Sequence, residues 1–404
     1  MASGLLPVDE ALARILDGVL PLAAEAVPLE EAAGRVLAAD IVATRTQPPF
    51  PASAMDGYAV RAADVAAVPA RLALVGRSVA GQRFAGRVDP GEAVRIFTGA
   101  PVPDGADAIL IQEDADTGAG GTVTARESVA AGRHIRRAGL DFAAGETVLA
   151  KGRVLDAAAL ALAAAAAGGT TLPVVRRPLV ALVSTGSELV PPGTMPGPDQ
   201  IVSCNAYGVA ALVGQAGGRA ADLGIEPDEE ARLRAAIRRA LELGADVIVT
   251  LGGASVGEHD LVAAALAAEG MTPGFWKIAM RPGKPLMFGR LGEVRVLGLP
   301  GNPVSSLVCS HLFLKPLVAA LAGLPYAADM REAVLAAPMA ANDHRQDYVR
   351  AEAVRQGDVL SVTPFATQDS SMLKTLAQAN ALIVRAPNAP PAAAGDACRV
   401  LVLR

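Results

Sequence analysis

Asp246-Val-Ile-Val-Thr-Leu-Gly-Gly-Ala-Ser-Val-Gly-Glu-His-Asp-Leu261 is the stretch of this 404-residue chain that decides its fold. The run 247–251 is short, apolar and rich in β-branched residues, which is typical of a strand buried on both faces. Gly252 and Gly253 then let the backbone turn without a side-chain clash and approach a ligand closely. The sequence therefore predicts a central strand followed by a glycine loop.

The second half of the stretch predicts either an anion site or an ordinary turn. Gly257 ends the loop, and Asp260 stands where a helix over 261–269 is expected to begin. A strand, a glycine loop and a helix N-terminus in this order present free N–H groups that can cradle an oxyanion. The loop also carries the carboxylates of Glu258 and Asp260, which suit an anion site when a cation lies between them. The alternative interpretation is a tight strand-to-helix turn with Asp260 as its N-cap.

Composition limits the class of protein. The length of the chain predicts about two to four domains. A formal net charge of −5 and an aromatic content of 3% argue against nucleic acid as the main partner. The longest uncharged run, 157–175, predicts an Ala-rich helix and a turn rather than a membrane span. No secretion signal is expected, because the N-terminus lacks a basic region.

The cysteines and histidines indicate a reducing compartment and argue against a zinc site. The three cysteines, Cys204, Cys309 and Cys398, are odd in number and widely spaced, which is typical of free thiols in the cytoplasm. The chain has four histidines, and none are spaced as ligand pairs.

The N-terminal part of the chain changes from helical to β patterns. Residues 8–19 and 29–37 are expected to form helices, and 38–44 a strand leaving them. The proline cluster 48–51 marks a domain crossing. From 71 to 148, short apolar runs separated by Gly, Pro and Asp predict a small all-β module. An Ala-rich helix over 156–167 follows.

From Arg177 onward, strands and helices alternate as in a doubly wound α/β domain. The expected elements are strand 178–185, helix 204–215, strand 219–223, helix 229–243, the central strand with its helix, strands 275–280, 286–288 and 294–299, and helix 302–323. After Pro325 the pattern is β again, and strands are expected at 347–353, 359–363, 381–385 and 399–403.

Four loops of the α/β domain are expected to meet at one edge of its sheet, because each follows a strand. They are 184–188, the glycine loop after 251, 281–285 and 299–306. Together with their flanks they supply carboxylates and cations, namely Glu188, Glu258 and Asp260 with Lys277, Arg281 and Lys284. Asn302 is expected to be a helix N-cap, with Pro303 at the first helical position.

Mixed charge in a glycine-lined groove is what magnesium-assisted phosphate chemistry requires. Carboxylates and water hold a hard cation, basic side chains neutralise the oxyanion, and backbone N–H groups cradle it. The alternative interpretation is a set of surface salt bridges around turns.

Motifs along almost the whole chain resemble one known family. They are Gly-Arg-Val-Leu-Ala at 34–38, Ser-Ala-Met-Asp-Gly-Tyr-Ala-Val at 53–60, Thr-Gly-Ala-Pro-Val-Pro at 98–103, Ile-Arg-Arg at 135–137 followed by Gly139 and Asp141, and the stretches 184–189, 252–260, 282–285 and 299–305. The last three fit any molybdopterin-binding domain. The motifs at 53–60 and 98–103, in a β module, narrow the resemblance to the molybdopterin molybdenumtransferases, bacterial enzymes akin to the E domain of gephyrin.

The resemblance implies an elongated subunit with four domains that forms a homodimer. Residues 1–46, completed by 146–177, would form N-terminal helices and an α/β linker domain, 47–145 the β module, 178–326 the molybdopterin-binding α/β domain and 327–404 a C-terminal β module. It also implies the last step of molybdenum cofactor synthesis, in the cytoplasm and without nucleic acid or membrane. Molybdate and Mg²⁺ would be bound, and molybdenum would be inserted into adenylylated molybdopterin as AMP is released. The adenylyltransferase that supplies this substrate is a further implied partner.

The matching motifs imply roles for individual residues. The catalytic set is Asp56, Thr98, Asp141, Glu188, Asp228 and Asp260, of which Glu188 and Asp260 would also hold the metal. The substrate-binding set is Ser184, Thr185, Gly186, Gly252, Gly253, Ser255, Gly257, Lys277, Arg281, Lys284, Pro300, Gly301, Asn302, Arg350 and Ser371.

The chain departs from the family pattern at three positions. Ser187 stands where an aspartate is common, Leu140 where an acid is frequent, and Arg281 where a lysine is common. Arg281 keeps the positive charge but replaces a point cation with a planar fork.

Two other functions compete with this interpretation. The adenylyltransferase uses the same α/β domain, but it would need neither the β module nor the C-terminal module. A non-catalytic scaffold, as gephyrin partly is, would bind partner peptides and would not need the carboxylates.

Overall fold

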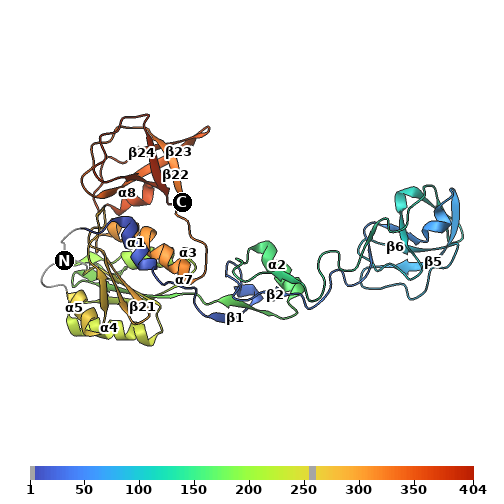
Figure 1. The fold of residues 1–404 in the computed structure, drawn as a ribbon, viewed down its shortest axis with the longest axis horizontal. Helices are drawn as coiled ribbons and strands as arrows, with labels where there is room; N and C mark the ends of the chain where they lie inside the picture. The colour runs from blue at the N-terminus through green and yellow to red at the C-terminus, as the bar shows by residue number, and fades with distance from the viewer. Residues whose placement is uncertain (1–4, 254–260) are drawn as a thin grey trace. The chain divides into compact units, whose positions relative to one another are not determined.

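The computed structural model describes residues 5–253 and 261–404, and the chain divides into two compact units (Figure 1). Unit 1 contains the described residues up to Glu25, Gly34–Ala38 and Pro173–Arg404, and unit 2 contains Ala26–Ala33 and Ala39–Leu172. Each unit is described by itself.

A six-stranded sheet forms the centre of unit 1. Its order is β16 (Arg219–Glu226), β13 (Leu179–Thr185), β17 (Val247–Leu251), β21 (Val294–Leu299), β20 (Met287–Leu291) and β18 (Thr272–Phe275). The first four strands are parallel, and β17 is buried along its whole length, as its β-branched run predicts. β20 runs antiparallel to both its neighbours, so the doubly wound sheet has a mixed edge.

Helices cover both faces of this sheet, as Figure 1 shows. One face packs against α1 (Val8–Leu16), α3 (Asn205–Gln215), α6 (Pro303–Cys309) and α7 (Lys315–Leu321), and the other against α4 (Glu230–Glu242) and α5 (Leu261–Ala268). Val8, Ala11 and Ile15 of α1 are buried in the same core as Phe313. Helix α1 therefore belongs to unit 1, whereas the family resemblance implied that residues 1–46 belong with the linker domain.

The expected long helix over 302–323 is interrupted once. A π-helical turn, η4 (Ser310–Leu314), separates α6 from α7. The hydroxyl of Ser310, the first residue of this turn, donates to the Ser306 carbonyl of α6 at 2.8 Å. By length and composition, 303–321 is the one helix of the described residues that could cross a membrane. Since 72% of its apolar window is buried inside the protein, it has the pattern of a core helix.

The C-terminal residues of unit 1, together with the short strand β19 (Met280–Arg281), form a second six-stranded sheet, the C-terminal barrel. Its order is β19, β23 (Gln346–Gln356), β24 (Val359–Pro364), β22 (Met330–Leu335), β26 (Ala397–Val402) and β25 (Ala381–Arg385). A further pairing of β23 with β25 closes the barrel, and α8 (Leu373–Gln378) lies between β24 and β25 in the chain. The prediction of β23 to β26 is confirmed, whereas β22 and α8 were not predicted.

Strand β19 corrects the prediction for residues 275–285. The predicted strand 275–280 does not form, and β18 ends at Phe275. β19 instead pairs in parallel with β23, so the loop 281–285 follows a strand of the C-terminal barrel and not of the α/β sheet.

A third six-stranded sheet forms the small β module predicted in unit 2. Its order is β7 (Ala108–Ile111), β4 (Gly57–Val60), β6 (Glu92–Ile96), β5 (Ala70–Ser78), β9 (Thr122–Ala125) and β8 (Ala115–Gly118). Tyr58, Leu72 and Leu110 lie in its core. The short helical turns η2 (Ala62–Val65) and η3 (Gln112–Asp114) connect its strands.

Short elements make up the remainder of the described chain. The two-stranded pairs are β1 (Ala24–Pro28) with β12 (Thr171–Val175), β2 (Ile41–Val42) with β11 (Thr147–Leu149), β3 (Ala52–Ser53) with β10 (Ile135–Arg136) and β14 (Leu189–Val190) with β15 (Ile201–Val202). Helix α2 (Ala157–Ala166) is N-capped by Asp156, whose carboxylate accepts the Ala159 N–H at 2.8 Å. The predicted helix 29–37 is wrong: only a 3₁₀ turn, η1 (Leu29–Glu31), forms, and Gly34 has a left-handed φ of 72°.

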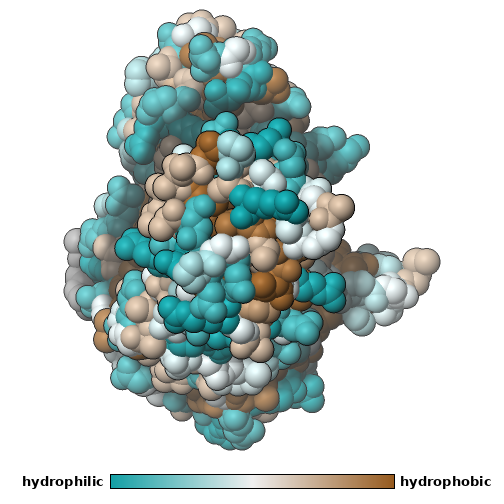
Figure 2. Space-filling view, turned by 90° about the vertical axis from the view of Figure 1, so that its right-hand side faces the viewer, coloured by the Kyte–Doolittle hydropathy of each residue, from teal (hydrophilic) through white to brown (hydrophobic). Residues whose placement is uncertain are grey.

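Hydrophilic side chains cover much of the face drawn in Figure 2, with apolar residues in small groups between them. The sheets described above therefore bury most of their apolar residues inside the units.

Candidate functional site

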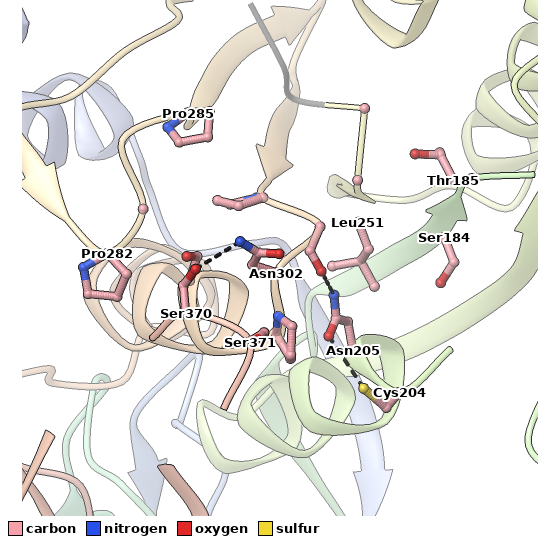
Figure 3. A pocket seen from close by; sticks show the side chains of 18 of the residues that line it. Ser184, Thr185, Cys204, Asn205, Leu251, Pro282, Pro285, Asn302, Ser370 and Ser371 are labelled. Atoms are coloured by element: carbon pink, nitrogen blue, oxygen red, sulfur yellow. Dashed lines mark hydrogen bonds between the residues drawn. The ribbon is translucent and has the colours of Figure 1, made fainter. Parts of the chain in front are cut away.

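A cavity of about 1310 Å³ lies in unit 1 and collects most of the residues expected to bind substrate (Figure 3). The predicted residues that line it are Ser184, Thr185, Gly186, Glu188, Asp228, Gly252, Gly253, Lys277, Arg281, Lys284, Pro300, Gly301, Asn302 and Ser371. The four predicted loops therefore meet. Ser255, Gly257, Glu258 and Asp260 lie outside the described residues.

The glycine pair after β17 brings the backbone close to Thr185. Gly252 and Gly253 have φ angles of 108° and 62°, and a Cβ on Gly252 would lie 2.6 Å from the Thr185 carbonyl oxygen. A Cβ on Gly253 would lie 2.2 Å from Val262 Cγ2, so the turn requires glycine at both positions. The Thr185 hydroxyl is buried beside this turn and has no hydrogen-bond partner among the described residues. An unpaired buried hydroxyl at a cavity wall is available to a ligand.

Carboxylates occupy the loops after β13 and β16. The Glu188 carboxylate folds back over its own loop, since a Cβ on Gly186 would meet it at 2.6 Å. Ser187 and Asp228 hold each other: the Ser187 N–H donates to Asp228 Oδ2 at 3.3 Å, and the Asp228 N–H donates to Ser187 Oγ at 3.2 Å. This exchange fixes the Asp228 carboxylate at the cavity wall.

Asn302 stands at the N-cap position of α6, followed by Pro303, as expected. Its side chain does not cap the helix, however, and Nδ2 donates instead to Ser370 Oγ at 2.8 Å. Asn205, at the start of α3, donates to the Gly301 carbonyl at 2.7 Å (Figure 3). These two amides tie the loop 300–303 to its neighbours on both sides.

The three predicted cations differ in their surroundings. Lys277 and Lys284 line the cavity and form no ion pair within the described part of the chain. Arg281 is paired with Asp347 and Asp343 of the C-terminal barrel, and its hydrogen bond to Asp347 raises the pKa of Arg281. Arg281 also lines the cavity, and its role as a substrate-binding residue stays a prediction.

The C-terminal barrel contributes residues that sequence patterns did not indicate, namely Arg345, Gln368, Asp369 and Ser370. Ser371, which was predicted, donates through both N–H and Oγ to Asp369 Oδ1, at 2.8 and 2.6 Å. These bonds lower the pKa of Asp369. The one available signal was the polar run 368–371 between two predicted strands.

Arg350 does not line the cavity, although it was predicted to bind substrate. It is fully buried, and its Nε and Nη2 atoms have no hydrogen-bond partner among the described residues. Burial lowers the pKa of Arg350, while Asp347 and Asp369 act against this shift. Gln368 bonds to both the N–H and the carbonyl of Arg350, at 2.9 and 3.0 Å. The residue that carries this buried, incompletely paired cation is therefore bonded through its backbone to Gln368, in the loop that carries Ser371.

Asp56, Thr98 and Asp141 belong to unit 2. Thr98 donates through N–H and Oγ1 to Asp56 Oδ1 at 2.7 and 2.8 Å, and these bonds lower the pKa of Asp56. Asp141 lies elsewhere in the unit, where its N–H donates to the Gln47 carbonyl at 3.0 Å.

Comparison with protein families gives three matches that follow one another along the chain. Residues 6–167 match "MoeA N-terminal region (domain I and II)", 181–320 match "Probable molybdopterin binding domain", and 332–403 match "MoeA C-terminal region (domain IV)".

Individual proteins agree with these matches. The chain is 40% identical over 387 residues to Molybdopterin molybdenumtransferase 2 of Mycobacterium tuberculosis, covering 93% of this chain and 94% of that one. It is 33% identical to Molybdopterin molybdenumtransferase of Bacillus subtilis, covering 99% and 94% of the two chains. The crystal structure of a molybdopterin biosynthesis MoeA protein from Pyrococcus horikoshii superposes with a TM-score of 0.84 at 29% identity, covering 99% and 100%. Because the similarity spans the chain from end to end, the protein belongs to the molybdopterin molybdenumtransferase (MoeA) family.

Proposed function

We propose that this chain inserts molybdenum into adenylylated molybdopterin with magnesium-dependent release of AMP. The observation that carries the proposal is the cavity of unit 1, where Glu188 and Asp228 lie in the same space as Lys277 and Lys284. Relatives named molybdopterin molybdenumtransferase support molybdenum as the metal transferred and molybdopterin as its acceptor.

The cations and the glycine turn would bind the phosphate groups. Lys277 and Lys284 supply charge that no described carboxylate neutralises. The turn at Gly252 and Gly253 allows close backbone approach, and the free Thr185 hydroxyl can bond to an oxygen there. These groups bind and orient the substrate.

The carboxylates would hold the magnesium ion. Mg²⁺ is commonly bound by one or two protein carboxylates together with waters and substrate phosphates. Glu188 and Asp228 fit this description, although the described residues contain no cluster of three or more potential protein ligands. When bound, the ion supplies charge neutralisation at the phosphate. The family motif pairs Glu188 with Asp260 as metal ligands, and Asp260 lies outside the described residues.

The loop 368–371 would bind molybdate. Ser371 lies on the cavity wall, and the charge of Arg350, which has two unpaired nitrogens, interacts with Asp369 of the same loop. A positive charge that lacks full compensation inside the protein attracts an oxyanion more strongly than the same charge in water.

The functional protein is proposed to be a homodimer in the cytoplasm. Asp56, Thr98 and Asp141 belong to unit 2, whereas the cavity belongs to unit 1, and the family motifs imply that both sets serve one reaction. A second copy of the chain would supply the unit 2 set. Free thiols at all three cysteines suit a reducing compartment.

Purified protein tests the proposal when it is given adenylylated molybdopterin, molybdate and Mg²⁺. We expect AMP and active cofactor in equal amounts, and neither product when molybdate or Mg²⁺ is omitted. An adenylyltransferase would instead convert ATP and molybdopterin to the adenylylated pterin. A non-catalytic scaffold would release no AMP, and either of these results would contradict the proposal.

A further inference from the structure

Arg281 lies on the cavity wall, but its guanidinium contacts the C-terminal barrel. Nε donates to Asp347 Oδ2 at 3.1 Å, and Nη2 donates to the same oxygen. Nη2 also reaches Asn342 Oδ1 at 3.3 Å, and Nη1 reaches Asp343 Oδ2 at 3.5 Å. All three partners belong to the segment 342–347, so the fork of Arg281 is filled by groups of the protein.

Backbone pairing places Arg281 and Asp347 together. β19 and β23 are parallel, and Arg281 and Asp347 are partners in their register. The Asp347 side chain is only 12% exposed, whereas that of Arg281 is 45% exposed. A carboxylate this far from water needs a cation beside it, and Arg281 is the cation that forms an ion pair with it.

The charge of Arg281 is therefore already paired with protein carboxylates when no ligand is bound. A substrate oxyanion that bound to the guanidinium would have to draw it from Asp347 and leave a buried carboxylate without its partner. Lys277 and Lys284 carry no such cost, since neither forms an ion pair within the described residues. An anion would thus bind to the lysines in preference to Arg281.

Strand β23 connects Arg281 to another segment that lines the cavity, the loop 368–371. Arg350 lies three residues after Asp347 in β23. Its backbone N–H donates to the Gln368 side chain, and its carbonyl accepts a hydrogen bond from the same side chain. Gln368 begins the loop that contains Ser370, and Ser370 accepts the hydrogen bond from Asn302. The position of β23 against β19 therefore sets the position of the loop 368–371 against the loop 282–285.

We propose that Arg281 is a positioning residue that clamps the C-terminal barrel to the cavity, and not a residue that binds the substrate. Its planar fork holds Asp347, Asn342 and Asp343 at once, which the single ammonium of a lysine could not do with the same geometry. The clamp fixes the separation between Lys284 and Ser371. The proposal rests on the proposed function, because it concerns the same cavity and its substrate.

Amide hydrogen exchange in the ligand-free protein tests the clamp without requiring activity. The variants are Arg281→Gln, Arg281→Lys, Asp347→Asn and the double variant Arg281→Gln/Asp347→Asn. We expect exchange across residues 366–372 to be about tenfold faster or more in Arg281→Gln and Asp347→Asn, as for loss of a charged hydrogen bond. Because both single changes break the same contact, the double variant should be no faster than either. Arg281→Lys should restore part of the protection.

Arg331→Gln is the matched control, since Arg331 makes a similar double contact with Asp329, at 2.8 Å for both bonds, in a part of the barrel that does not line the cavity. It should leave exchange at 366–372 unchanged.

A binding titration separates the clamp from a substrate contact. If Arg281 contacted the substrate, Asp347→Asn would remove a competing carboxylate and tighten the binding of adenylylated molybdopterin. The clamp predicts instead that Asp347→Asn and Arg281→Gln lower kcat by a similar factor. Unchanged exchange at 366–372 in both single variants, or tighter binding in Asp347→Asn, would overturn the clamp. Failure of the wild-type protein to release AMP would refute the proposed function and leave the exchange result to decide the clamp.

Discussion

At the scale of single residues, Lys284 shows how the cavity can separate binding from catalysis. Its ammonium lines the cavity and forms no ion pair with a described carboxylate, so its charge is available to an anionic ligand. The carboxylates of Glu188 and Asp228 lie in the same cavity, where they would repel a bare phosphate. Under the proposed function, binding would therefore depend on the cations, and the carboxylates would act by holding the metal ion.

Replacing Lys284 should weaken substrate binding. Lys284→Ala removes one charge-assisted contact, which is worth about 1.5–3 kcal/mol, and should raise the Kd for adenylylated molybdopterin about ten- to a hundredfold. Isothermal titration measures this. Lys374→Ala, which removes an exposed lysine of α8 that does not line the cavity, is the control. An unchanged Kd for Lys284→Ala would place the anion elsewhere.

Residues that line the cavity could be predicted from the sequence where the local backbone conformation requires a particular residue type. The glycines after β17 and the polar groups after β13 could be predicted because the chemistry of a turn is local. Gln368 and Ser370 could not, because their place depends on the position of the C-terminal barrel. The contact between Arg281 and Asp347 could not be predicted for the same reason, since the two residues lie 66 positions apart in the chain.

At the scale of elements, the loop 282–285 depends on close packing beneath it. Gly283 has a φ of 109°, and a Cβ there would lie 2.5 Å from the Sγ atom of the buried Cys309. The loop that presents Lys284 to the cavity is thus held directly on helix α6.

Gly283→Ala should therefore destabilise the protein. We expect a loss of about 1–3 kcal/mol relative to Gly292→Ala, which has a positive φ of 58° but open space around its Cβ. Scanning calorimetry on both variants measures the difference. In the double variant Gly283→Ala/Cys309→Ala the clash with sulfur is gone, so the combined loss should be smaller than the sum of the two single losses. A strictly additive double variant would show that Cys309 is not the obstacle.

Elements were predicted well where a buried apolar run coincides with one strand or helix, as in β13, β17 and α4. The run at 275–280 misled because its apolar residues serve two sheets: Phe275 ends β18, and Met280 begins β19. Apolar periodicity reports burial, and it does not say against which sheet a residue is buried.

At the scale of the whole molecule, the division into two units motivates a homodimer. The cavity lies in unit 1, and Asp56, Thr98 and Asp141 lie in unit 2. We expect sedimentation equilibrium at micromolar concentration to give twice the chain mass of 40.9 kDa. A sedimenting species of one chain mass at that concentration would contradict the dimer.

The multidomain fold was predictable because the change from β to α/β and back to β patterns is visible in the spacing of apolar runs and glycines. The mixed edge of the central sheet was not predicted. β20 and β21 are antiparallel and joined by two residues, but a buried apolar strand has the same sequence pattern whether its neighbour is parallel or antiparallel.

Single-turnover AMP release by Glu188→Gln tests most directly whether the cavity carries out the chemistry. This substitution keeps the size of the side chain and removes the charge proposed to hold magnesium. The variant should fold with the wild-type Tm, bind adenylylated molybdopterin at least as tightly as wild type, and release no AMP when molybdate and Mg²⁺ are added. Glu242→Gln, a carboxylate exposed on α4 that does not line the cavity, should release AMP normally. Near-normal AMP release by folded Glu188→Gln would contradict the proposed metal site and leave Glu188 as a residue of the turn alone.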